Sequence, residues 1–295
     1  MSAGQTLALL YQQLASPPAP AKIDLHIHST HSDGEYSPAQ ILDEVEAADV
    51  LVFAVTDHDT TSAIPEIRAL MRERGSTRRL VAGVEITCTF DDREAHLLGY
   101  GIDLSNAPLQ EMLARVRDGR RTRFLAMAEL LIEWGVRLRP GLAEALAART
   151  AAPGRRNLAD LLVRESLIGT VAEAFRRWLS QPAIGAIAKV RVPLGEAIAA
   201  ISAAGGLASL AHPSRYFNVE VLRELHSMGM RGLECEYPFP KRLTRTNQLR
   251  AMAGELGLLV TGGSDCHGPE PIARRIGTFG LSADDWDRLG LRTYS

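Results

Sequence analysis

"KIDLHIHSTHSDGEYS" spans Lys22 to Ser37 and begins with a short apolar run that ends in polar residues. Three of the eight histidines in the chain, and one aspartate, fall between His26 and Asp33. Side chains alternate across a strand, so His26 and His28 would point to the same face. Two neutral imidazoles side by side suit a metal such as zinc, manganese or iron. The stretch therefore predicts a strand that ends at a metal site.

Several further segments repeat this pattern of an apolar run that ends in polar residues. Helical segments separate most of these runs, and repeated strand–helix units predict a parallel sheet covered by helices, most economically a barrel. Ser37, Pro38 and Gln40 form a capping-box signature that predicts the start of one such helix. We expect strands at residues 23–27, 51–59, 79–87, 95–103, 206–211, 232–237 and 258–263.

A long helical region interrupts the strand pattern. Apolar residues recur at helical spacing from about 106 to 135, and shorter helical segments follow over 141–180. The predicted fold class is therefore α/β, a βα barrel with a helical insertion. The expected divisions are an N-terminal extension and linker at 1–20, a first barrel part at 21–104, the insertion at 105–190 and a second barrel part at 191–295.

The residues that follow the predicted strands are of metal-ligand types. In a βα barrel, functional side chains lie at the C-terminal ends of the strands. A lone histidine at a strand end is most often structural, but six separate segments here carry a His, Asp or Glu near a strand end, with His96 at the start of its strand, which predicts a metal site. These residues are His26, His28 and Asp33; Asp57, His58 and Asp59; Glu85; His96; His212; and Asp265 and His267.

Composition narrows the class of protein. The net charge of −2 and pI near 6.5 argue against a global field that attracts nucleic acid or an anionic membrane. No apolar run approaches the roughly 20 residues of a membrane span. The three cysteines form no CxxC pair, which favours a reducing cytoplasm over a disulfide framework. Residues 1–20 read as a short helix, about 5–15, and a Pro-rich linker rather than a signal peptide.

Six motifs resemble those of the PHP (polymerase and histidinol phosphatase) family of metal-dependent phosphoesterases, in the family's order. They are HIHSTHSDG (26–34), TDHDT (56–60), GVEIT (83–87), AHLLGYGID (95–103), AHPSRY (211–216) and GGSDCHG (262–268). The resemblance implies a distorted (β/α)7 barrel and a cluster of two to three divalent ions. Manganese is the favoured metal, and iron, zinc and magnesium are the alternatives.

The resemblance also implies a ligand set, carried over motif by motif. The first metal would take His26, His28, Glu85 and Asp265. The second would take Asp33, His58 and His267. The third would take His96 and His212 together with Glu85, which would bridge two ions. His31 occupies a variable position, so we expect it to be a bystander; the alternative is that it supports the ligands or donates a proton to the leaving group.

The layout most resembles the branch of nucleoside 3′,5′-bisphosphate phosphatases that also act as 5′→3′ exoribonucleases on short RNA. We therefore expect a phosphoric ester hydrolase that removes the 3′-phosphate of such bisphosphates and degrades short 5′-phosphorylated RNA. Its partners would be small phosphorylated substrates or short RNA, with no membrane and no stable duplex nucleic acid. The alternatives are a phosphatase for another monoester such as histidinol phosphate, and a non-catalytic metal-binding regulatory domain.

An amidohydrolase-type C–N hydrolase also uses a HxH pair on a barrel, but the missing carbamylated-lysine position counts against it. For phosphoester hydrolysis, metals lower the pKa of bound water, and the resulting hydroxide would attack phosphorus in line with the leaving oxygen. No protein nucleophile is needed, so we expect Cys266 to serve packing.

Arginines are the expected substrate clamps, because the planar guanidinium binds phosphate bidentately. Arg155 in GRRNLA and Arg215 in HPSRY match arginines of the branch. Asn157 is a further expected substrate contact, although the branch has histidine there. The segment IGAIAK (184–189) is a second departure from the branch. The five arginines of RVRDGRRTRF (115–124) would form a solvated helix face or collect an anionic substrate.

Overall fold

Eight strands form one curved sheet that nearly closes into a barrel. The computed structural model describes residues 22–239 and 242–295, so the helix expected at 5–15 lies outside the described residues. Seven strands follow the order β1-β2-β3-β4-β6-β7-β8, and the short β5 pairs with β3. A bridge between Ile27 and Cys266 links β1 to the segment that follows β8. The barrel-type fold expected from the sequence is confirmed.

The strands on both sides of the barrel run parallel, as predicted. One parallel set comprises β1 (Ile23–Ile27), β2 (Val52–Val55) and β3 (Arg79–Phe90). The other comprises β6 (Leu207–Leu210), β7 (Gly232–Glu236) and β8 (Leu259–Gly262). Every residue of β1, β2 and β7 is buried; β2 is entirely apolar, whereas β1 and β7 also bury charged or polar side chains such as His26 and Glu234.

One strand departs from the parallel pattern. β4 (Arg93–Tyr100) runs antiparallel to both β3 and β6. Asp91 and Asp92 alone join β3 to β4, and both have positive φ, at 47° and 58°. A two-residue turn of this kind makes a hairpin, whereas parallel strands need a longer crossover connection. The barrel is therefore distorted at β4, where the expectation of an entirely parallel sheet is wrong.

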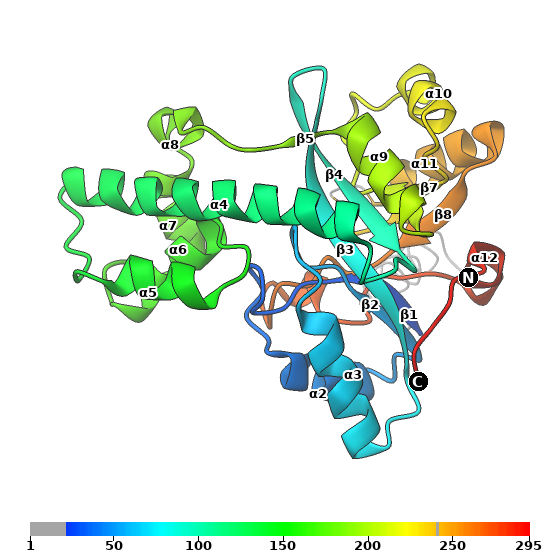
Figure 1. The fold of residues 1–295 in the computed structure, drawn as a ribbon, viewed down its shortest axis with the longest axis horizontal. Coiled ribbons are helices and arrows are strands. Elements are labelled where there is room, and N and C mark those ends of the chain that lie inside the picture. The colour runs from blue at the N-terminus through cyan, green and yellow to red at the C-terminus, as the bar shows by residue number, and fades with distance from the viewer. Residues whose placement is uncertain (1–21, 240–241) are drawn as a thin grey trace, which may run out of the picture.

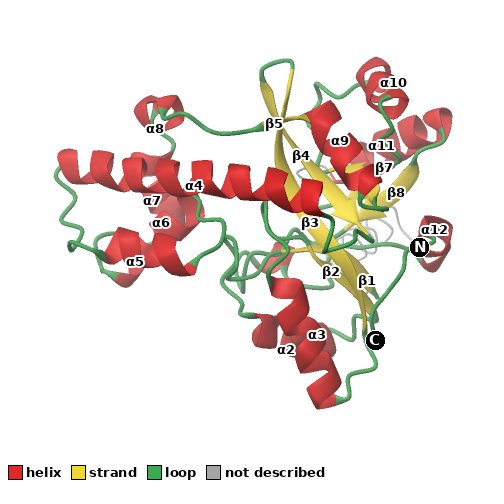
Figure 2. Ribbon diagram, viewed as in Figure 1, coloured by secondary structure: helices red, strands yellow, loops and turns green. Residues whose placement is uncertain are grey.

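Helices cover the outside of the sheet (Figures 1 and 2). The predicted capping box is confirmed, since the Gln40 backbone N–H donates to Ser37 Oγ and the Ser37 N–H donates to the Gln40 side chain. The short helices η2 and α12 were not anticipated. The covering helices are α2 (Pro38–Ala47), α3 (Ala63–Arg74), α9 (Leu194–Ala203), α10 (Val219–Ser227), α11 (Arg242–Leu256) and α12 (Ala283–Leu289). The short η2 (Ile272–Arg274) instead brings Arg274 to Asp265.

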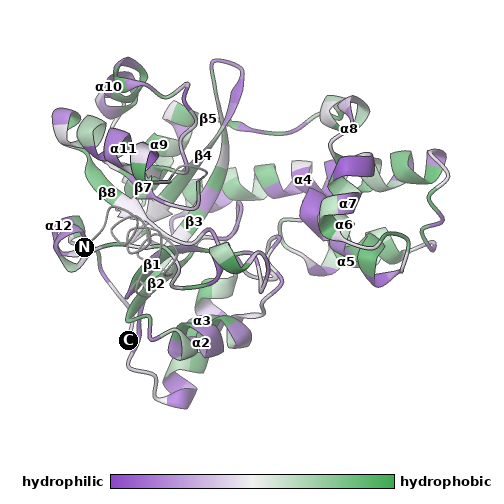
Figure 3. Ribbon diagram, turned by 180° about the vertical axis from the view of Figure 1, so that it is seen from behind, coloured by the Kyte–Doolittle hydropathy of each residue, from purple (hydrophilic) through white to green (hydrophobic). Residues whose placement is uncertain are grey.

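A second group of helices stands to one side of the barrel (Figure 1). It consists of the long α4 (Ala107–Glu133), α5 (Leu142–Arg149), α6 (Arg155–Arg164), α7 (Val171–Ala174), η1 (Phe175–Leu179) and α8 (Pro182–Ala186), and the chain returns through β5 (Val192–Pro193). These helices mix hydrophobic and hydrophilic residues along their length (Figure 3). Their apolar side chains form a hydrophobic core of their own.

Helix α4 belongs to both cores. Leu109, Leu113 and Val116 in its first half pack into the barrel core. Phe124 and Leu131 in its second half pack into the core of the helical group. The arginine-rich middle of α4 therefore lies where the two cores meet. No helix in the described part of the chain is long and apolar enough to span a membrane.

Candidate metal centre

All nine side chains expected as metal ligands meet near the C-terminal ends of the strands. Five of the nine are buried and the other four are partly buried, because the strands and the loops that follow them face the interior of the barrel. Their potential ligand atoms form four groups, each within 4.8 Å. The groups are His28, Asp33, His58 and His267; His26, His28 and Asp265; His26, Glu85 and His212; and His58, Glu85 and His96.

Glu85 lies at the middle of this arrangement. Its Oε1 is 3.0 Å from His96 Nδ1 and 2.9 Å from His212 Nε2. Its Oε2 is 3.0 Å from His58 Nδ1 and 3.3 Å from His28 Nε2. Because each oxygen faces different histidines, the carboxylate is placed to bridge two ions. The expected division of ligands among individual ions stays a prediction, since His28 also belongs to the Asp33 group.

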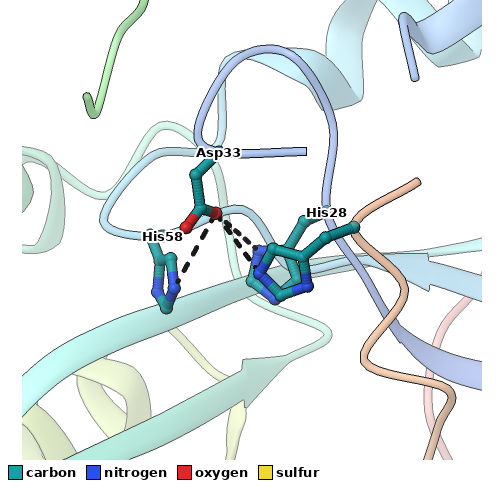
Figure 4. A group of neighbouring side chains, drawn as sticks. His28, Asp33 and His58 are labelled. Atoms are coloured by element: carbon teal, nitrogen blue, oxygen red, sulfur yellow. Dashed lines mark ion pairs between the residues drawn. The ribbon is translucent and has the colours of Figure 1, made fainter. Parts of the chain in front are cut away.

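Asp33 approaches the cluster from a loop rather than from a strand (Figure 4). Its Oδ1 lies 3.8 Å from His28 Nδ1, 3.9 Å from His58 Nε2 and 3.4 Å from His267 Nε2. Gly34 permits the tight loop, because a Cβ there would lie 2.3 Å from the His28 carbonyl oxygen. The loop therefore presents one carboxylate oxygen to three imidazoles.

Asp57 holds this loop from the barrel side. It accepts hydrogen bonds from the Ser29 backbone N–H at 2.7 Å, from Ser29 Oγ at 2.6 Å and from Ser32 Oγ at 2.5 Å. Charge-assisted hydrogen bonds of this kind are stronger than neutral ones. Asp57, the first aspartate of the TDHDT motif, thus positions Asp33, although Asp57 itself belongs to none of the four ligand groups.

Several buried atoms of the cluster have no hydrogen-bond partner. These atoms are His28 Nδ1, Asp33 Oδ1, His58 Nδ1 and His96 Nε2. A buried polar atom left without a partner costs roughly 1–3 kcal/mol. The Nε2 atoms of His26 and His28 also lie only 3.1 Å apart. Divalent ions would satisfy these atoms together, and the mixed imidazole and carboxylate donor set suits them. The residues therefore fit a metal cluster.

The electrostatics of the cluster favour added positive charge. Burial disfavours the ionised form of Glu85, but His58, His96 and His26 hold its pKa well below the ordinary value. Burial likewise disfavours a charged His28, yet Asp265 and Glu85 raise its pKa to about 10. Buried carboxylates that stabilise a cation on a neighbouring imidazole would also stabilise a divalent metal ion.

Glu234 contacts two of the histidines, although it lies in none of the six motifs. Its Oε1 lies 2.9 Å from His26 Nδ1, and its Oε2 accepts the His212 backbone N–H at 2.6 Å. A carboxylate on the outer ring nitrogen fixes the orientation of a metal-binding histidine. An acidic residue inside an otherwise buried strand was the sequence signal that could have revealed it.

The other expected site residues differ in how close they lie to the cluster. His31 faces α3 instead, with Nδ1 2.7 Å from Ser62 Oγ and Nε2 3.1 Å from Glu66. Arg215 is exposed and lines neither cavity described below. Cys266 is fully buried, and burial raises the pKa of its thiol to about 12, in keeping with a packing role.

Asn157 contacts the chain's own backbone. Its Oδ1 accepts the Gly154 N–H at 2.7 Å, which caps α6, and its Nδ2 donates to the Ser32 carbonyl at 2.9 Å. Nearby, Arg156 pairs with Glu35 at 2.5 Å. Side chains of the helical group therefore contact the loop that carries Asp33 on both sides of that residue. The expected contact of Asn157 with substrate stays a prediction.

Three of the five clustered arginines on α4 turn inward. Arg120 pairs with buried Asp59 at 2.5 Å and donates to Thr87 Oγ1 at 2.6 Å. Arg117 donates to the Asp59 carbonyl, and Arg123 donates to carbonyls of the helical group. The expectation of a solvated arginine face is wrong for these three, because the meeting of the two cores buries this side of the helix.

Two cavities open from the cluster. The smaller, about 140 Å³, is lined by Asp33, His58 and His96 together with five cationic side chains: Arg120, Arg123, Arg155, Arg156 and Lys189. The larger, about 400 Å³, is lined by six of the expected ligands and by Tyr237, Pro238, Phe239 and Arg274. Arg155, Arg120 and Arg123 belong to segments expected to bind an anionic substrate, whereas Lys189 and the aromatic side chains lie outside every motif identified from the sequence.

Comparison with known proteins gives consistent matches over most of the chain. The 5′-3′ exoribonuclease Rnm of Salmonella typhimurium is 32% identical over 259 residues, covering 84% of this chain and 86% of that protein. The 3′,5′-nucleoside bisphosphate phosphatase of Chromobacterium violaceum is 29% identical over 265 residues, covering 87% of this chain and 91% of that protein. No family model matches the chain.

A solved structure is similar at the level of the whole fold. It is a protein of Bifidobacterium adolescentis assigned as a metal-dependent phosphoesterase, with a TM-score of 0.81 and 30% sequence identity. The match covers 93% of this chain and 96% of that one. The similarity therefore includes the barrel and the helical group.

Proposed function

The chain belongs to the PHP family of metal-dependent phosphoesterases, and from this premise we propose that it removes the 3′-phosphate of nucleoside 3′,5′-bisphosphates and shortens 5′-phosphorylated RNA from its 5′ end. The enzyme class itself, a hydrolase of phosphoric esters, follows from the relatives. The substrate is the proposal.

One observation carries this choice of substrate. The cavity that Asp33, His58 and His96 line is also lined by five cationic side chains. A substrate with a single phosphate would use only the metal centre. A substrate with a second phosphate nearby would also use the cationic wall, because arginine and lysine are the usual protein partners of phosphate oxygens.

The nine expected ligands would hold the ions in this scheme, with manganese as the proposed metal. Bound there, the ions would supply charge neutralisation at the scissile phosphate and activation of water. The chain's own residues bind and orient the ester. Arg155 is exposed on the rim of the smaller cavity, where it can reach a phosphate, and the insertion at 105–190 would cap the substrate.

The larger cavity has the character of a nucleoside site. Tyr237 and Phe239 stand edge to face at 5.9 Å, and Tyr237 also lies 6.4 Å from the His212 ring. Aromatic faces next to a phosphate-binding centre suit the stacking of a base. A nucleoside in this cavity would place one phosphate at the cluster and point the other toward the cationic wall.

The test is inorganic phosphate release from adenosine 3′,5′-bisphosphate with manganese added. Histidinol phosphate runs in parallel, and His26→Ala is the control. We expect rapid release from the bisphosphate that the His26→Ala variant loses. Release from histidinol phosphate alone would overturn the substrate, and bound metal without turnover of any phosphoester would favour a regulatory domain.

A further inference from the structure

Lys189 lines the smaller cavity because the linker that carries it packs closely against α4. It lies in the linker between α8 and β5, and its neighbour Val190 packs against α4 at Gly119. A Cβ on Gly119 would lie 2.3 Å from Val190 Cγ2, so only glycine lets the linker approach this far. The approach brings Lys189 to the same cavity as Arg120 and Arg123.

The ion pairs around Lys189 leave the cavity with excess positive charge. Lys189 Nζ lies 2.7 Å from Glu94 Oε1, but Glu94 also pairs with Arg191 at 3.1 Å and lies 3.4 Å from His96. Within the described residues, Arg123 and Arg155 have no carboxylate partner. Their guanidinium groups are fixed instead by the carbonyls of the helical group and by the Phe175 ring.

The cavity is also small and selective in what it can hold. At about 140 Å³ it falls below the 300–1,000 Å³ of sites that enclose whole drug-sized ligands. Lys189 itself is mostly buried, with 17% of its side chain exposed. A buried lysine is costly unless it is paired, and the partner of Lys189, Glu94, is shared with Arg191 and His96. A compact anion such as a phosphate group matches both the size and the charge.

We propose that Lys189 determines specificity for the second phosphate of the substrate, the 5′-phosphate, which it would bind together with Arg123 and Arg155 while the scissile phosphate lies at the cluster. This assignment rests on the proposed function and deepens it. The segment 184–189, which departs from the sequence of the branch, would then have a defined role. It supplies a cation that binds the phosphate at the end of the nucleotide remote from the reaction.

The experiment compares Lys189→Met with Arg191→Met. Both substitutions remove a partner of Glu94, but Arg191 does not line the cavity. The ratio of kcat/KM for adenosine 3′,5′-bisphosphate to that for adenosine 3′-monophosphate is measured for each protein. We expect the ratio to fall about tenfold or more in Lys189→Met, since a hydrogen bond to a charged group is lost, and to stay unchanged in Arg191→Met. Equal ratios in all three proteins would overturn the assignment.

A binding measurement keeps this test separate from the proposed function. Adenosine 5′-monophosphate is titrated calorimetrically into the manganese-loaded wild type and both variants. Weaker binding by Lys189→Met alone would support the phosphate site even if the bisphosphate were not hydrolysed, in which case only the substrate proposal would fail. A fall in melting temperature of Lys189→Met with unchanged affinity for the monophosphate would assign Lys189 a structural role and overturn the inference.

Discussion

At the scale of single residues, the centre depends on carboxylates that serve several histidines at once. Glu85 contacts histidines from four different segments. Glu234 contacts the His26 ring and the His212 backbone N–H. Both are fully buried, so a change at either is felt by more than one ligand. We therefore expect side chains outside the direct ligand set to affect metal binding.

Glu234→Gln tests this dependence. The amide is close in shape, but it accepts more weakly and would loosen both His26 and the backbone of His212. We expect the affinity for manganese to fall about 10- to 100-fold, the usual effect of losing a carboxylate partner of a metal-binding histidine. Calorimetric titration measures it, with the exposed Glu66→Gln as control. An unchanged affinity would show that Glu234 only packs.

Lys189 makes stability depend on pH in a defined direction. Burial lowers its pKa from 10.5 to about 8, so the folded protein binds this proton less tightly than the unfolded chain. Stability should therefore rise with pH between about 8 and 10.5, and charging Lys189 costs roughly 3 kcal/mol at neutral pH. We expect Lys189→Met to melt higher than wild type at pH 7 and to lose this advantage toward pH 10. A constant difference across that range, read from thermal melts, would contradict the argument.

The nine residues that meet at the cluster could be named from sequence because their pattern is local, and their binding of metal stays a prediction. His26 and His28 share a strand face, and the remaining ligand types recur at strand ends, where barrels place function. Lys189 and Arg120 could not be placed in the same way, and the only sequence signal for Glu234 was an acidic residue inside a buried strand. Their roles depend on which distant segments meet, and a lysine in a linker or an arginine on a helix reads as solvent-exposed until that pairing is known.

Among helices and strands, too, the features set by a few neighbouring residues were predicted correctly, and a feature set by long-range pairing was missed. The strand at 23–27 and the helix that begins after Ser37 are confirmed, because burial and capping act within a few residues. The reversal of β4 was missed, since the Asp91–Asp92 turn carries no glycine to signal a hairpin. That reversal turns His96 toward Glu85, so the distortion of the barrel is part of the metal centre.

Replacing Arg120 tests whether its ion pair with Asp59 stabilises the packing of α4 on the barrel. Its guanidinium is the cationic partner of Asp59, which is fully buried. Arg120→Met would leave that carboxylate without a counter-charge, and we expect a loss of about 3 kcal/mol of unfolding free energy. Urea denaturation measures the loss, with the exposed neighbour Arg121→Met as control. If the double variant with Asp59→Asn were no more stable than Arg120→Met alone, the ion pair would not be the cause.

At the scale of the whole molecule, two hydrophobic cores share α4, and the cluster lies beside their junction. The barrel supplies the expected metal ligands, while the helical group supplies most of the cationic wall and grips the Asp33 loop. The expected metal ligands and most of the cationic side chains thus come from different parts of the chain. A cluster of close, buried ligand atoms should also make the folded protein more stable when ions occupy it.

Metal removal tests this link between the cluster and stability. Ions that bind only the folded state stabilise it by mass action, about 4 kcal/mol at a thousand times the dissociation constant. We expect treatment with a chelator to lower the melting temperature by several degrees and manganese to restore it. His26→Ala should show a smaller response. A melting temperature that does not respond to manganese would argue against ions at this centre.

We infer that nine residues, with Glu85 at their centre, hold a cluster of metal ions. Anomalous diffraction from crystals of the manganese-loaded protein tests it most directly. We expect two to three anomalous peaks within the four ligand groups, with Glu85 between at least two of them. Peaks elsewhere, or none among these residues at saturating manganese, would contradict it.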